Sequence, residues 1–179
     1  MELRKEIEPQ LEIAEKLYPE ILKSIMDYTD FVDENGDEEN IEYQKLESKI
    51  HNLTGKDMSK YNLWEWWEGE GAEVLSFRIV LPNPLKVEDI TKEELSKIVC
   101  NRLEGFDNCL LNKNEDNQSF KAQFHPYLTD YYHDFLKLNF KKTYNYPKIF
   151  GPQNDKNKRQ FWLSNLEKTE KLWNNGIFQ

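Results

Sequence analysis

The sequence predicts an α+β fold in a single domain, with an N-terminal helical hairpin, a small antiparallel sheet and further helices packed on it. Three observations lead to this prediction. The length of 179 residues is typical of one domain. Apolar residues recur at three- and four-residue steps over most of the chain, whereas one stretch alternates with a period of two. We therefore expect a helical hairpin over residues 1–55 and mixed strands and helices over residues 60–179.

The predicted hairpin consists of two helices joined by an acidic loop. Residues 2–28 place their apolar side chains on one stripe, which is typical of an amphipathic helix. Pro9 and Pro19 each lack a backbone donor, so a break or kink is expected near one of them. An Asn-Gly pair, a strong turn signal, lies in the acidic loop over residues 30–38. The second helix is expected over residues 39–53.

The clearest predicted strand spans residues 73–81 and ends at Pro82. Its odd-numbered positions give one strongly apolar face, formed by Leu75, Phe77, Ile79 and Leu81. After this strand, Thr91 and Glu94 match a capping box, in which each side chain accepts from the backbone amide of the other residue. A helix is therefore expected from this point to about Glu104.

The segment over residues 106–125 is ambiguous. Residues 109–111 and 119–124 are each compatible with a short strand, and the polar residues between them are compatible with the turn of a hairpin. If these two strands do not form, the chain is mainly helical.

Two helices are expected in the C-terminal third. The first spans residues 130–142, is capped by Thr129 and is lined with aromatic and apolar side chains. The second begins near Asn154 or Asp155 and ends around Gly176.

Charge is unevenly distributed along the chain. The net charge is −9, but residues 1–70 hold 19 acids and 8 bases, whereas residues 71–179 hold 14 acids and 16 bases. An acidic half repels phosphate backbones, so we expect no nucleic-acid partner. A protein with a basic surface is the partner that this charge favours. The alternative is that these acids form an ordinary solvated surface.

The cysteines and the hydropathy favour a cytoplasmic location. Cys100 and Cys109 are the only cysteines and do not form a disulfide framework. The first residues lack the apolar core of a signal peptide, and no apolar run approaches the roughly 18 residues of a membrane span. We expect no contact with a membrane. The oligomeric state stays open.

The segment from Leu63 to Gly71 has the composition of a protein-binding hot spot. Its three tryptophans occupy four positions and cannot all face one way on a helix or strand, so at least one is expected near the surface. Large rings beside carboxylates suit recognition of arginine and lysine. The predicted partner-binding residues are Trp64, Glu65, Trp66, Trp67, Glu68 and Glu70, with Asp33, Asp37 and Glu38 from the acidic loop. The alternative is that all three rings pack in the core.

No cofactor or metal is expected. The acidic loop has a glycine and oxygen ligands at the spacing of a calcium-binding EF-hand, but that register puts Phe31 at the first ligand position. The histidines and cysteines lack zinc-ligand spacing. No glycine-rich phosphate loop is present either. No catalytic motif is recognised, and two further alternatives stay open: an enzyme using His125, His133 and nearby tyrosines, or a structural homo-oligomeric subunit.

The Trp-Glu-rich segment, the single amphipathic strand and the run from Tyr131 to Leu136 followed by Asn139-Phe140 resemble small acidic immunity proteins of bacterial polymorphic-toxin systems. The resemblance covers about residues 64–140 and rests on the general character of the sequence. It implies a non-catalytic cytoplasmic inhibitor that binds a cognate toxin domain. A basic toxin is a natural partner for an acidic, aromatic surface, because complementary charge speeds encounter.

Overall fold

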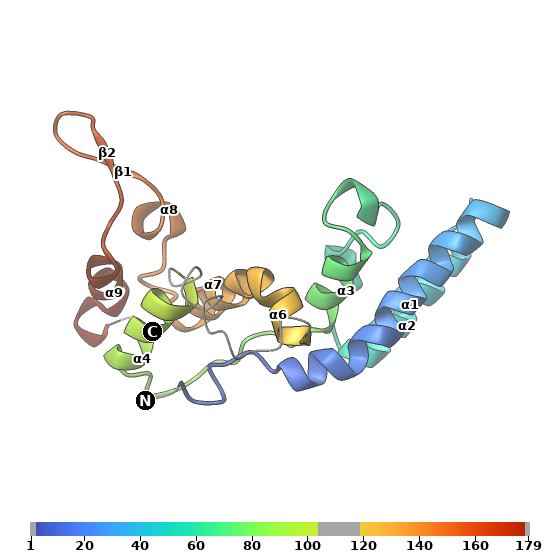
Figure 1. Cartoon of the computed structure of the whole chain (residues 1–179), viewed down its shortest axis with the longest axis horizontal. Helices are drawn as coiled ribbons and strands as arrows, with labels where there is room; N and C mark the ends of the chain where they lie inside the picture. Colours follow the sequence, from blue (N-terminus) through green and yellow to red (C-terminus); the bar gives the residue numbers. More distant parts are fainter. Residues whose placement is uncertain (1–2, 104–118, 178–179) are drawn as a thin grey trace. The chain divides into compact units, whose positions relative to one another are not determined.

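A computed structural model of the chain describes residues 3–103 and 119–177 (Figure 1). The fold is α+β: helices dominate, and the strands β1 (Gln153–Asn154) and β2 (Gln160–Phe161) form a two-stranded antiparallel sheet. The chain forms two compact units. The N-terminal unit comprises residues 10–82. The C-terminal unit comprises residues 83–179 together with residues 1–9.

The N-terminal unit contains the predicted helical hairpin. Helices α1 (Leu11–Asn35) and α2 (Ile41–Thr54) pack side by side (Figure 1). A third helix, α3 (Ala72–Val80), packs against α1. The face of α1 that is buried carries residues at helical spacing: Ala14, Ile21, Ser24, Ile25 and Tyr28.

The predicted bounds of the first helix were wrong at both ends. The expected break falls at Pro9, so α1 begins at Leu11, and residues 3–9 belong to the C-terminal unit. Pro19, by contrast, lies inside the helix. Most of the predicted acidic loop is helical, because α1 continues to Asn35. Gly36 then ends it with φ +71°, and its N–H donates to the Val32 carbonyl at 2.8 Å.

The prediction of a strand over residues 73–81 was wrong, because these residues form α3. Glu73 and Arg78 are exposed, whereas the other residues of this helix are buried. A helix buried on nearly all sides carries apolar residues at both odd and even positions, so periodicity does not distinguish it from a buried strand. Packing against α1 therefore outweighs the strand preference of valine, isoleucine and phenylalanine.

The C-terminal unit is built around α4 (Lys92–Lys97), α7 (Leu128–Asn139) and α9 (Asn165–Trp173). Helix α4 continues as a π-helix over Ile98–Leu103, which contacts α4, α7 and α9. Side chains with no exposed surface fill the core of this unit: Ile7, Leu95, Ile98, Val99, Phe135, Leu136, Phe140 and Leu172. The predicted capping box is confirmed, since Thr91 Oγ1 accepts from Glu94 N and Glu94 accepts from Thr91 N.

Two other expectations for this unit differ from the structure. Residues 120–124 form the short helix α6 (Phe120–Phe124) and no strand, because the Ser119 side chain caps the amide of Ala122. The rest of the predicted hairpin, residues 106–118, lies outside the described residues. Helix α7 begins at Leu128, so Thr129 lies within its first turn and does not cap it.

The last helix begins about ten residues later than predicted. Residues 155–159 form the turn between β1 and β2, where the Asp155 carboxylate accepts from the amides of Asn157 and Arg159 at 2.7 and 2.8 Å. Helix α9 begins at Asn165, after a capping box between Ser164 and Glu167. A short helix, α8 (Tyr146–Ile149), precedes the sheet.

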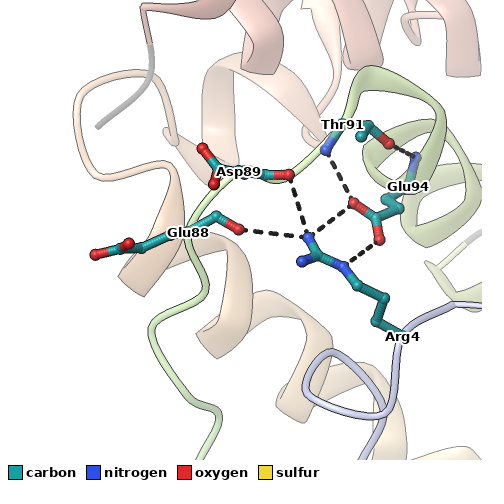
Figure 2. A network of polar contacts seen from close by, with 5 residues as sticks. All are labelled: Arg4, Glu88, Asp89, Thr91 and Glu94. Atoms are coloured by element: carbon teal, nitrogen blue, oxygen red, sulfur yellow. Dashed lines mark hydrogen bonds and ion pairs between the residues drawn. The ribbon is translucent and has the colours of Figure 1, made fainter.

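Residues 3–9 are held to the rest of the C-terminal unit by two ion pairs, Arg4–Glu94 and Glu8–Arg102. The Arg4 guanidinium donates to both oxygens of Glu94, at 2.6 and 3.0 Å, and to the carbonyls of Glu88 and Asp89 (Figure 2). Burial raises the pKa of Glu94, but hydrogen bonds from Arg4 and Thr91 outweigh this effect and lower the pKa below its usual value.

The second ion pair joins Glu8 to Arg102. The Glu8 carboxylate accepts from Arg102 and, at 2.5 Å, from the hydroxyl of Tyr132. Burial and the nearby Glu8 charge raise the pKa of Tyr132, so this hydroxyl stays protonated and acts as a donor. Residues 3–9 are therefore fixed to α7 and to the π-helix by charged hydrogen bonds.

Candidate protein-binding surface

Two of the predicted tryptophans are anchored to α1. The Trp66 side chain, at the start of the 3-10 turn Trp66–Glu68, donates from Nε1 to Thr29 Oγ1 at 3.1 Å. The ring of Trp64 meets the ring of Tyr28 edge-on, with 6.0 Å between centroids. Both tryptophans are half-buried. They therefore belong partly to the core and partly to the surface.

Asn62 sets the local shape of this segment. Its side-chain oxygen accepts from the amides of Trp64 and Glu65 at 3.2 and 3.0 Å, and its amide nitrogen donates to Glu65 Oε2 at 3.0 Å. Such a turn, closed by the side chain of an asparagine, fixes the backbone that follows. Sequence reasoning missed Asn62, although an asparagine just before the tryptophans is a recognisable turn signal.

Tyr28 joins the tryptophan segment to the acidic loop. Its ring also meets the ring of Tyr43 edge-on at 5.7 Å, and its hydroxyl donates to Asp37 Oδ2 at 3.3 Å. Burial, with the Asp37 charge, raises the pKa of Tyr28 to about 12, so the hydroxyl stays a donor. Residues from α1, the acidic loop, α2 and the tryptophan segment thus form one cluster around a buried tyrosine.

Asp37 is part of the scaffold of this cluster. Its carboxylate accepts from the amides of Tyr43 and Glu42 at 2.9 and 3.3 Å and so caps the first turn of α2. Burial raises the pKa of Asp37, but these amides and the Tyr28 hydroxyl lower it further and leave it below its usual value. Of the predicted loop acids, Asp33 and Glu38 are exposed.

Two hollows adjoin the tryptophan segment, and Glu65 lines both. One has a volume of about 350 Å³ and is lined by Asn40, Tyr43, Trp64 and Glu65. The other, of about 330 Å³, is lined by Lys60, Tyr61, Asn62, Glu65, Trp66, Gly69, Glu70, Leu75 and Arg78. In the second hollow Glu70 is already paired with Arg78 at 2.8 Å. We call the first the Trp64 hollow and the second the Trp66 hollow.

The structure brings most of the predicted residues of this segment to one place. Trp64, Glu65, Trp66 and Glu70 line the two hollows. Glu68 is exposed beside them but lines neither hollow, and the side chain of Trp67 lies outside what the structure describes. Tyr43 and Tyr61 also line the hollows and were not predicted, because they lie in helical and loop patterns with no feature of their own.

The N-terminal unit carries the negative charge of the chain. Residues 10–82 contain 17 Asp and Glu and 7 Lys and Arg, a net of −10, which leaves +1 for the rest of the chain. A third hollow of about 280 Å³ lies between α1 and α2, but its acids Asp27 and Glu42 are balanced by Lys45 and Lys49, so the negative charge is that of the unit as a whole. A basic molecule approaching this unit is therefore attracted at long range.

Aromatic residues outside the predicted surface also gather at places in the C-terminal unit. Trp162 is 60% exposed and follows β2, next to Phe161, which is 42% exposed. His133, one of the two histidines of the enzyme alternative, bonds the Tyr144 hydroxyl through Nδ1 at 3.1 Å. The centroid of its ring lies 5.1 Å from that of Tyr146 and 4.9 Å from that of Phe150. Its ring is therefore packed among aromatic rings.

Comparison with known proteins finds no matching family model, no similar curated protein and no similar solved structure. Among the described residues, each helix is too short or too polar to cross a bilayer. Within the same residues, no three His, Cys, Asp or Glu side chains converge as a metal site requires.

Proposed function

We propose that this chain is a non-catalytic protein-binding domain of the immunity-protein type, which neutralises a basic toxin domain through the acidic, tryptophan-rich surface of its N-terminal unit. The observation that carries the proposal is the fixed, half-exposed placement of Trp64 and Trp66 beside the exposed carboxylates of Glu65 and Glu68. Interfaces derive most of their binding energy from a few anchored aromatic residues.

Prior fixation of these rings supports tight binding. The hydrogen bond to Thr29 holds the Trp66 indole, and the Tyr28 ring holds that of Trp64. Side chains that are already ordered lose little conformational entropy when a partner binds, whereas a free side chain costs about 0.5–1.5 kcal/mol. The charge of −10 on the same unit increases the rate of encounter with a basic partner.

The first test is to capture partners from the native cell on the tagged chain at low salt and to identify them by mass spectrometry. We expect one basic protein, released as salt is raised. Expression of that protein alone should stop growth, and co-expression with this chain should restore it. A captured protein that is harmless, or acidic, would contradict the proposal.

The second test locates the surface by substitution. Trp66→Ala should weaken binding of the captured protein by at least about 30-fold, as expected for a hot-spot residue worth about 2 kcal/mol. Because Trp66 is half-buried, the exposed variant Glu68→Lys accompanies it; its association rate should fall without loss of the fold. The matched control is Trp162→Ala, which removes an exposed ring from the C-terminal unit. If Trp162→Ala loses binding and the other two variants do not, the interface lies on the C-terminal unit and the proposal is contradicted.

Ionic strength provides an independent measurement. The association rate should fall steeply between about 0.01 M and about 0.15 M salt, since the screening length shrinks from about 30 Å to about 8 Å over that range. A rate that does not change with salt would exclude electrostatic attraction as the reason for the acidic surface.

A further inference from the structure

We propose that the Trp64 hollow is a pocket for an arginine side chain of the partner. This inference rests on the proposed function and specifies the chemical group that the surface recognises. The hollow is lined by two aromatic rings, one carboxylate and one carboxamide. A guanidinium stacks on aromatic rings and donates hydrogen bonds to carboxylates, so these four side chains offer the contacts that it needs.

The aromatic walls are held in place from behind. Tyr43 and Trp64 both pack edge-on against Tyr28, at 5.7 and 6.0 Å, and Tyr28 is only 6% exposed. The Tyr43 hydroxyl also accepts from the amide of Leu63 at 3.5 Å. A cation near such rings is attracted by the negative electrostatic potential of the ring faces. Because the rings are fixed, a ligand meets a preformed wall.

The polar groups of the hollow have unused acceptors. Glu65 Oε2 accepts from Asn62 at 3.0 Å, whereas Glu65 Oε1 accepts no hydrogen bond within the described part of the chain. The side chain of Asn40 makes no capping hydrogen bond to α2, which leaves its oxygen available. A guanidinium carries five N–H donors in a planar fork, which is enough to serve more than one acceptor.

Comparison with the Trp66 hollow shows why the Trp64 hollow is the better cation site. Lys60 and Arg78 line the Trp66 hollow, and Arg78 already pairs with Glu70 at 2.8 Å. No basic residue lines the Trp64 hollow. Glu65 lines both hollows, so the difference lies in the basic residues: an incoming cation would meet Lys60 and Arg78 in the Trp66 hollow and no basic side chain in the Trp64 hollow.

The start of α2 lies beside the Trp64 hollow and carries a partial positive charge that opposes a cation. The carboxylate of Asp37 accepts from the amides of Glu42 and Tyr43 and offsets this charge. Glu38 and Glu39 are exposed next to it and add negative charge. The local field at the hollow therefore favours a cation in spite of the helix terminus.

The test is titration of the full chain with N-acetyl-arginine amide, followed by NMR of the tryptophan indole N–H signals, with the Trp64 signal assigned by Trp64→Phe. The neutral isostere N-acetyl-citrulline amide and the amide of N-acetyl-lysine serve as matched ligands. We expect weak, saturable binding of the arginine compound that shifts the Trp64 signal, and binding at least about 5-fold weaker for each of the other two compounds, which lack the charge or the planar fork.

Substitutions then assign the contact. Glu65→Gln keeps the size and exposure of the side chain and should weaken arginine binding about 10-fold, whereas Glu68→Gln, in the same segment but outside the hollow, should change it less than 2-fold. Equal binding of the citrulline or lysine compound would overturn the proposal. Equal weakening by the two glutamate substitutions would also overturn it.

The arginine test and the partner test fail separately. If the arginine compound does not bind but a basic protein is captured and depends on Trp66, the pocket is wrong and the proposed function stands. If the arginine compound binds as expected but the captured protein is acidic or harmless, the pocket stands and the proposed function is wrong.

Discussion

Replacement of Asn139 by leucine should destabilise the C-terminal unit by about 2–4 kcal/mol. Asn139 is 1% exposed at the end of α7, and all of its side-chain polar atoms are used. Its oxygen accepts from the Val87 amide at 2.8 Å, and its nitrogen donates to the carbonyls of Leu85 and Phe135 at 3.0 and 3.1 Å. Asn139 thus fixes the extended segment before α4 to the end of α7.

The magnitude follows from what leucine leaves behind. The size of the side chain is nearly unchanged, so little cavity energy is involved. The buried Val87 amide loses its acceptor, which costs about 1–3 kcal/mol, and the Leu85 carbonyl loses a hydrogen bond worth about 1 kcal/mol. For a slope of about 2 kcal/mol per molar urea, the middle of the usual range, the midpoint of denaturation should fall by about 1–2 M.

Two measurements check this expectation. Urea denaturation gives the change in the free energy of unfolding, and hydrogen exchange followed by NMR reports on the Val87 amide itself, which should lose protection. The control is Asn101→Leu, an exposed position in the same unit, which should change stability by less than about 0.5 kcal/mol. A loss below about 1 kcal/mol for Asn139→Leu, or unchanged exchange at Val87, would refute the reasoning.

Three further predictions concern stability. Folding lowers the pKa of Glu94, so its carboxylate stabilises the fold above its ordinary pKa of 4.5, and this contribution is lost as the pH falls through the lowered value. Glu94→Gln should therefore be less stable than the wild type at neutral pH, with a difference that shrinks below about pH 4; a difference independent of pH would contradict this. Gly151→Ala should lower stability by about 1–3 kcal/mol in thermal melts, because the added Cβ would lie 2.7 Å from the Pro147 carbonyl oxygen. Gly69→Ala, whose Cβ meets nothing closer than 3.9 Å, is the control and should melt within a few degrees of wild type. Ser76→Ala should be neutral or stabilising by up to about 1 kcal/mol in urea, because the buried hydroxyl has no hydrogen-bond partner in the described chain, and a loss of more than 1 kcal/mol would mean that it has one.

The helical part of the fold follows from the sequence where local signals are strong. The capping box at Thr91 is local, and its prediction is confirmed. A break near either Pro9 or Pro19 is also expected from local signals, and the structure places it at Pro9. The capping box at Ser164 has the same spacing, but the predicted start near Asn154 or Asp155 places Ser164 inside the helix, whereas residues 153–161 form the two-stranded sheet and its turn.

Helix α3 shows what local signals cannot supply. Its alternating apolar residues fit a strand, and only packing against α1 decides for a helix. The two partners lie tens of residues apart in the chain, so no window of sequence around α3 contains the deciding information. Ser76 illustrates the same point, since a polar residue inside an apolar run suggests an exposed position but is fully buried.

The residue types of the candidate surface can be predicted from the sequence, whereas their geometry cannot. Tryptophans interleaved with glutamates predict a surface suited to basic groups. The contacts that orient Trp66 and Trp64, however, come from Thr29 and Tyr28, more than thirty residues earlier. The same long-range contacts separate acids that look equivalent in sequence: Asp37 is consumed in capping α2, whereas Glu38, its neighbour, stays exposed. Charge alone therefore predicts which partners are attracted, and the hydrogen bonds of each carboxylate decide which of them remain available to bind one.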